Sequence, residues 1–140
     1  MTKPQEISDI LFKMTRDVCD TGKKSQIAAA ITRRGNIVSF GYNNYNKSHP
    51  FQKKYSKNES CIFWHAETHA IHNALRNGQD VSGCDLHITR SKTHKTPKKD
   101  YLVTGLAKPC RGCMRAIKEH GIANVYYTTE TTEIEVMEIV

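Results

Sequence analysis

Two short groups of residues combine side chains that can hold a metal ion and move protons. His65 and Glu67 stand two apart in the string HAE, and Cys110 and Cys113 stand three apart in the string PCRGC. Cysteines three apart lie on the same side of a helix's first turn, so both sulfurs can reach one ion. The amides at a helix start lower the pKa of a thiol and favour the thiolates that zinc requires. With His65 as a third ligand, the fourth tetrahedral position is left for water, which is typical of catalytic zinc.

Glu67 has a different expected role. Residues two apart in a helix point to different sides, so His65 and Glu67 can converge on one site only at the helix mouth. There the carboxylate can take a proton from a zinc-bound water and pass it to a leaving group. This combination suits the hydrolytic removal of an amino group from an aromatic ring.

Hydrophobic spacing predicts the elements that bring the two groups together. We expect helices over about 6–20, 65–76 and 109–120, and strands over 26–32, 37–42, 86–89, 124–128 and 133–139. Both groups then stand at helix starts. The order of elements predicts one α/β domain over residues 1–140, with helices packed on a mixed five-stranded sheet. The connection Thr129–Thr132 is far shorter than a parallel crossover, so the last strand should run antiparallel to its neighbour.

Two segments have less regular sequences. Residues 43–63 are polar and without clear period, and their place before the helix that carries His65 favours a functional role. Residues 90–108 form a basic excursion with room for a short returning strand over 101–104. Its lysines, Lys92, Lys95, Lys98 and Lys99, could hold phosphate on a nucleotide or a strand, or could form a solvated hairpin tip.

The two motifs together resemble the zinc-dependent cytidine and deoxycytidylate deaminase superfamily, in its compact phage and bacterial form, whose signature pairs His-x-Glu with Pro-Cys-x-x-Cys. The resemblance extends to the element order and implies the three-layer cytidine-deaminase-like sandwich. It implies that His65, Cys110 and Cys113 bind one catalytic Zn²⁺ and that Glu67 shuttles protons. The implied reaction converts a cytosine-containing nucleoside or nucleotide to its uracil form with release of ammonia.

The resemblance also implies substrate-binding residues and an assembly. Asn43 matches a strand-end asparagine that holds the sugar or base, although Gly-Tyr-Asn-Asn is also a good turn. The backbone amide of Ala66 would face the ring carbonyl. Trp64 could stack on a base or could belong to the core. Relatives of this size are homo-oligomers, so we expect a homo-oligomer here.

Composition sets the expected surroundings. The chain has a formal charge of +7, which favours phosphorylated small molecules or nucleic acid as partners. No apolar run is long enough to span a bilayer, and the polar start lacks a signal peptide's apolar core, so we expect a cytoplasmic protein with no membrane partner. The five cysteines are then reduced thiols or metal ligands rather than a disulfide framework.

Departures from the family pattern leave the substrate open. Deoxycytidylate deaminases usually carry Asn where this chain has His69, and they tend to insert a helix before the last strand. A zinc-protease helix requires Glu directly after the first histidine, and this chain has Ala66 there. An alternative metal site could be formed by three histidines on one helix face, His65, His69 and His72. The sequence is also compatible with a deaminase acting on cytosine in single-stranded nucleic acid, with a noncatalytic nucleic-acid-binding module, and with a redox Cys-x-x-Cys pair.

Overall fold

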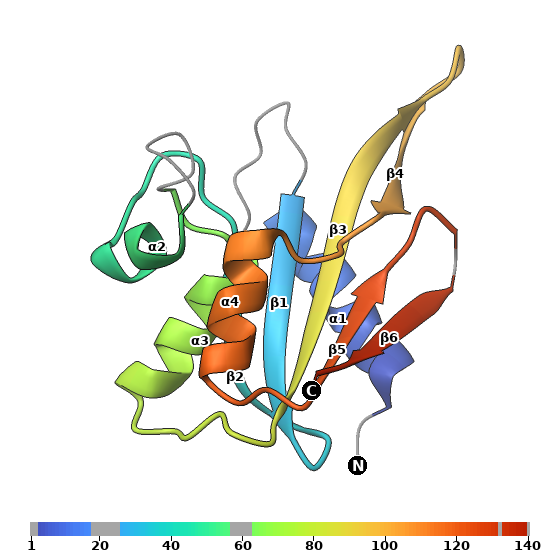
Figure 1. Cartoon of the computed structure of the whole chain (residues 1–140). Coiled ribbons are helices and arrows are strands. Elements are labelled where there is room, and N and C mark those ends of the chain that lie inside the picture. Colours follow the sequence, from blue (N-terminus) through green and yellow to red (C-terminus); the bar gives the residue numbers. More distant parts are fainter. Residues whose placement is uncertain (1–2, 18–25, 57–62, 132, 140) are drawn as a thin grey trace.

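The computed structural model describes residues 3–17, 26–56, 63–131 and 133–139 (Figure 1). The elements are α1 (Pro4–Asp17), β1 (Gln26–Arg33), β2 (Asn36–Tyr42), α2 (Pro50–Tyr55), α3 (Ala66–Arg76), β3 (Asp85–Lys95), β4 (Asp100–Gly105), α4 (Arg111–Glu119), β5 (Asn124–Thr128) and β6 (Ile134–Glu138). Across the described ranges, no helix is long and apolar enough to cross a membrane.

The strands form one mixed sheet. Five of them follow the order β2-β1-β3-β5-β6, and the sixth, β4, pairs with β3 outside this path. β5 runs parallel to β3, whereas β1 pairs antiparallel with both β2 and β3. β6 is antiparallel to β5, which confirms the prediction from the short connection. The predicted count of five strands is one too low, because β3 continues past its predicted end and gains β4 as a partner.

Helices cover both faces of the sheet and form the expected three layers. Figure 1 shows α3 and α4 in front of the sheet and α1 behind it. Because successive side chains of a strand point to opposite faces, β1 serves both cores. Ala28 and Ala30 pack with Ile7 of α1. Ala29 and Ile31 belong to the larger core, which includes buried side chains of α3 and α4.

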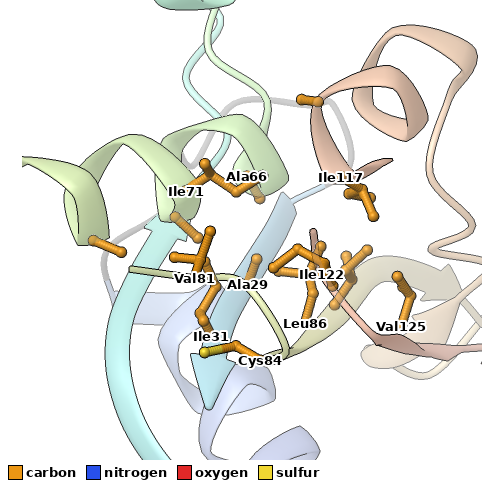
Figure 2. Close-up of a cluster of buried hydrophobic side chains, with 14 of the residues drawn as sticks. Ala29, Ile31, Ala66, Ile71, Val81, Cys84, Leu86, Ile117, Ile122 and Val125 are labelled. Carbon is orange, nitrogen blue, oxygen red and sulfur yellow. The ribbon is translucent and has the colours of Figure 1, made fainter. Parts of the chain in front are cut away.

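This larger core fixes the two motif-bearing helices on the sheet (Figure 2). Ile71 of α3, Ile117 of α4 and Leu86 of β3 belong to it, and each is fully buried. Burying an aliphatic side chain of this size contributes roughly 1.5–3 kcal/mol. Packing against the sheet therefore sets where each helix begins, and with it the position of each motif.

Most elements lie within two residues of the predicted ranges, and the main differences are in α1, in the segment 43–63 and in β3. α1 begins at Pro4, a residue tolerated in a helix's first turn, and residues 18–20 of the predicted helix lie outside the described residues. The irregular segment 43–63 contains the short helix α2, whose N-cap His49 accepts a hydrogen bond at Nδ1 from the Phe51 N–H at 3.0 Å. β3 runs to Lys95 because β4 satisfies its backbone groups there. We call the projecting β3–β4 hairpin, residues 90–105, the arm (Figure 1).

Candidate active site

His65 and the two cysteines of the second motif meet at the starts of α3 and α4. His65 is the N-cap residue of α3, Cys110 is the N-cap residue of α4, and Cys113 lies in the first turn of α4. The Nδ1 of His65 is 3.3 Å from Cys113 Sγ and 3.7 Å from Cys110 Sγ. Ligand atoms around a tetrahedral zinc lie about 3.5–3.8 Å apart. Within the described residues these side chains are the cluster of potential metal ligands, with all three donor atoms inside 4.8 Å of one another, and they fit zinc.

The two thiols differ in charge before any metal binds. Side-chain hydrogen bonds from Cys113 and His65 lower the pKa of Cys110 to about 3. The backbone N–H of Cys113 also donates to Cys110 Sγ at 3.5 Å, as expected at a helix start. The hydrogen bond to Cys110 and burial raise the pKa of Cys113 well above its ordinary value. The pair therefore carries one thiolate at neutral pH, and metal binding would release the second proton.

Glu67 lies beside this cluster without belonging to it. It occupies the first turn of α3, and only 6% of its surface is exposed. Burial raises the pKa of Glu67, whereas the nearby His65 and a hydrogen bond with Cys113 lower it. A carboxylate buried beside three metal-ligand side chains is placed for proton transfer rather than for solvation.

α2 packs against both ligand-bearing helices, α3 and α4. The side chain of Gln52 is 2% exposed, and its Oε1 accepts a hydrogen bond from the His65 backbone N–H at 3.1 Å. The same oxygen accepts a hydrogen bond from the hydroxyl of Thr68, one turn into α3. In a capping box the N–H of the N-cap residue is accepted by a side chain three residues further on, whereas here Gln52 of α2 accepts it. The side chain of His65 makes no capping bond. Gln52 therefore holds the backbone of the N-cap residue from a neighbouring helix, and the imidazole of His65 is available to a metal.

Two glycines allow the backbones around the site to approach closely. A Cβ built on Gly112 of α4 would lie 2.1 Å from the carbonyl oxygen of Tyr55 in α2. A Cβ on Gly41 of β2 would lie 2.2 Å from the backbone nitrogen of Ala70 in α3. Both distances are far below van der Waals contact, so only glycine fits at either position. The Gly of the PCRGC string thus has a packing role between its two cysteines.

Asn43 lies buried at the end of β2, where its side chain has a structural contact. Its Oδ1 accepts a hydrogen bond from the Ile27 N–H at 2.9 Å, and its own N–H donates to the Ile27 carbonyl at 3.1 Å. These bonds tie the end of β2 to the start of β1. No turn is found at residues 41–44, because Asn43 extends the pairing of β2 with β1, and its contact with substrate stays a prediction.

Trp64 and Ala66 flank the metal ligand His65 in the chain. The half-buried ring of Trp64 stacks on His49, with ring centroids 5.0 Å apart and an angle of 21° between planes. His69 and His72 also lie against it, at 4.9 and 5.4 Å. Ala66 is buried as the first residue of α3. Neither residue's predicted role toward substrate is tested by these contacts.

The all-histidine metal face has no counterpart in the described residues. His69 turns toward β2, where its Nδ1 accepts a hydrogen bond from the Tyr42 N–H at 3.1 Å. Burial lowers the pKa of His69 and of His72 and so favours the neutral form of each imidazole. His69 therefore secures the end of β2 against α3 instead of joining His65 on a metal.

Sequence reasoning missed the residues of α2. Gln52 supports His65, and the hydroxyl of Tyr55 donates to Glu119 Oε2 at 2.5 Å at the other end of α4. The available signal was His49-Pro50, a capping residue followed by a proline suited to the first helical position. A helix of six residues is too short to show a hydrophobic period, and its key buried residue, Gln52, is polar.

Comparison with known proteins agrees with this geometry. Residues 1–129 match the family described as the cytidine and deoxycytidylate deaminase zinc-binding region, and the chain belongs to this family. An "Uncharacterized deaminase in luxG 3'region" of Aliivibrio fischeri is 28% identical over 110 residues, which are 78% of this chain and 62% of that protein. The chain therefore spans about six tenths of that relative's length.

Solved structures share the fold. Cytidine deaminase from Burkholderia pseudomallei matches with a TM-score of 0.61 at 17% identity, over 99% of this chain and 93% of that one. The dCMP deaminase of the cyanophage S-TIM5 matches with a TM-score of 0.53 at 20% identity, over 91% of this chain and 80% of that one. These matches confirm the predicted cytidine-deaminase-like fold.

Proposed function

We propose that this protein is a zinc-dependent hydrolase that converts a cytosine-containing nucleoside or nucleotide to its uracil form and releases ammonia. The observation that carries the proposal is the position of buried Glu67 beside the ligand cluster of His65, Cys110 and Cys113. The cyanophage S-TIM5 enzyme, which has the same fold, is known in complex with dCMP and dUMP. That pair of molecules supports a cytosine nucleotide as the substrate class.

The ligand cluster would hold one zinc ion through His65 Nδ1 and the sulfurs of Cys110 and Cys113. Such an ion supplies a water-derived nucleophile near neutral pH through its open fourth position. The chain's part is to hold the three donor atoms in place before binding. Gln52 fixes the backbone of His65, and the first turn of α4 fixes the two sulfurs.

Glu67 would carry the protons of the reaction. Its carboxylate takes a proton from the attacking water and gives it to the neighbouring ring nitrogen, as the new C–O bond forms at the carbon that bears the amino group and the ring C=N bond opens. It then takes the proton of the new hydroxyl group and delivers it to the leaving nitrogen as the C–N bond breaks and the carbonyl forms. The net reaction consumes one water and releases one ammonia, and Glu67 returns to its starting state. Burial keeps this carboxyl group away from bulk water, which would compete for the proton.

The substrate contacts follow from the residues around this centre. Asn43 would bind the sugar or base, the Ala66 amide would donate to the ring carbonyl, and Trp64 would stack on the ring. Lys108 and Arg111 are exposed on either side of Cys110 in the chain, so a phosphate on the sugar would find basic partners near the site. We therefore favour a phosphorylated nucleotide over a plain nucleoside. A homo-oligomeric assembly, a single domain over residues 1–140 and a cytoplasmic location remain part of this proposal.

A substrate panel tests the proposed function. Purified, zinc-loaded protein is incubated with cytidine, deoxycytidine, their mono- and triphosphates, adenosine, guanine and a single-stranded oligonucleotide, and ammonia release is measured. Glu67→Ala protein with the same zinc content is the blank. We expect fastest release from a cytosine nucleotide and none from the blank. Turnover of adenosine or guanine alone would overturn the assignment to cytosine.

A further inference from the structure

The net positive charge of the chain is concentrated in one segment. The whole sequence has a formal charge of +7. Residues 90–115 contain eight Lys or Arg side chains and one acidic side chain, Asp100, so this segment alone accounts for a charge of +7. The rest of the chain holds equal numbers of basic and acidic side chains. The segment comprises the arm, the link to α4 and the start of α4, which carries Cys110 and Cys113.

The arm rises from the end of the sheet at which α4 begins (Figure 1). Its base is fixed to β5: the Arg90 N–H donates to the Thr128 hydroxyl at 3.1 Å, and this hydroxyl donates to the Gly105 carbonyl at 2.8 Å. From Gly105 the chain reaches Cys110 in five residues. The arm therefore has a fixed attachment beside the metal-ligand cluster.

The tip of the arm presents basic and aromatic side chains to solvent. Lys95, Lys98 and Lys99 are exposed, and no carboxylate of the described residues forms an ion pair with them. The ammonium group of Lys99 lies 4.8 Å from the ring centroid of Tyr101, which is 45% exposed. By contrast, Lys92 near the base pairs with Glu130. The unneutralised charge is thus at the tip.

The tip of the arm extends well beyond the attached base of the arm. β3 continues for five residues from Arg90 to Lys95. An extended strand rises about 3.3 Å per residue, so the tip stands about 17 Å beyond the base of the arm. A mononucleotide carries its phosphates beside one sugar, whereas a nucleic-acid strand repeats a charge at every nucleotide. Basic side chains beside an exposed aromatic ring are the combination that binds single strands.

We propose that the arm binds single-stranded nucleic acid and leads the strand toward the metal-ligand cluster at the start of α4. Binding by the arm and by the basic segment that follows it needs no catalysis and stands on the charge and shape of residues 90–115 alone. The second half of the proposal rests on the proposed function and extends its substrate from a free nucleotide to a cytosine within a strand.

Fluorescence anisotropy tests the proposal by measuring the affinity of the protein for labelled oligonucleotides of about 20 nucleotides, one single-stranded and one duplex. The arm variant is Lys95→Gln/Lys98→Gln/Lys99→Gln. The control, Lys13→Gln/Lys47→Gln/Lys53→Gln, removes the same charge from exposed positions outside the arm. We expect the arm variant to lose about tenfold or more in affinity, and its salt slope to fall by about 2, because a single strand gives about 0.7 per phosphate contact. The control should change little, and Tyr101→Ala should weaken single-strand binding more than duplex binding.

Equal losses in the arm variant and the control would overturn the proposal, as would equal affinity of the unmodified protein for single-stranded and duplex probes. A loss of mononucleotide turnover in the arm variant would assign the tip lysines to the phosphate of a free nucleotide and would also overturn it. A change of oligomeric state without a change in oligonucleotide binding would make the arm a contact between copies of this chain and would overturn it too. Tight strand binding by a protein that deaminates no substrate would instead support the arm and refute the proposed function.

Discussion

The side-chain oxygen of Gln52 and the backbone N–H of His65 are joined by a hydrogen bond of 3.1 Å, although thirteen residues separate them in the chain. The same oxygen accepts a hydrogen bond from the Thr68 hydroxyl, so Gln52 ties the N-cap residue of α3 to the first turn, while the His65 side chain makes no capping bond. An N-cap that must present its imidazole to a metal needs its backbone held by another residue. Gln52 supplies that support from α2.

Loss of the Gln52 side chain should weaken metal binding more than it weakens the fold. We expect Gln52→Ala to lower zinc affinity about 10–100-fold, as is typical when the support of a ligand is removed. Gln52→Glu keeps an acceptor oxygen and should recover part of that affinity. The absorption bands of the cobalt-substituted protein report the ligand geometry directly. Lys53→Ala, at the exposed neighbouring position, is the control and should leave the spectrum unchanged. An unaltered cobalt spectrum in Gln52→Ala would show that Gln52 does not position His65.

Gly112→Ala tests the close contact between α4 and α2. In a free helix this change stabilises by roughly 0.5–1 kcal/mol, because glycine loses more conformational freedom on folding. Here the added Cβ would meet the Tyr55 carbonyl at 2.1 Å, so we expect destabilisation by about 1–3 kcal/mol. Urea denaturation measures the free energy of unfolding. A variant as stable as the parent, or more stable, would mean that the two helices do not pack in this way.

Cys113→Ser should abolish zinc binding, because it removes one of the three converging donor atoms. Metal content after dialysis is the measurement. Cys84→Ala is a matched control, since Cys84 is a buried thiol in the core that lies outside the ligand cluster. The control should lose some stability but keep its zinc. Full zinc content and activity in Cys113→Ser would refute the ligand assignment.

His87 makes stability depend on pH away from the site. It is 4% exposed and bonded through Nε2 to the Thr32 hydroxyl at 3.0 Å, and burial lowers its pKa to about 4. Below about pH 6.5 the unfolded chain takes up a proton that the folded protein refuses until about pH 4. The contribution of His87 to the free energy of unfolding is therefore complete above about pH 6.5. The free energy of unfolding should fall by about 3 kcal/mol as the pH drops from about 6.5 to about 4.

His87→Gln should remove this part of the pH dependence. The quantity to compare is the free energy of unfolding of variant and parent between about pH 4 and 6.5. His94→Gln, at an exposed position on the same strand, is the control and should follow the parent. Parallel curves for His87→Gln and the parent would show that His87 takes up its proton equally in both states.

Residue types and spacing predict the metal-ligand cluster better than they predict the residues that hold the cluster in place. The starts of α3 and α4 follow from two motifs at helix starts, and the antiparallel β6 follows from a connection too short for a crossover. α2 escapes prediction because its contacts are polar and reach across the chain, as the bond from Gln52 to His65 shows. The length of β3 is not predicted either. Residues 91–95 are polar, and they are extended only because they pair with β4 in the folded protein.

The central claim is that Glu67 moves protons while His65, Cys110 and Cys113 hold the metal. Ammonia release from dCMP by Glu67→Gln protein, with its zinc content determined on the same sample, tests this claim most directly. We predict one zinc per chain in both proteins and a loss of turnover of at least about 10²-fold in the variant, the usual contribution of a positioned acid–base group. Turnover at the parent's rate by the zinc-loaded variant would contradict the account.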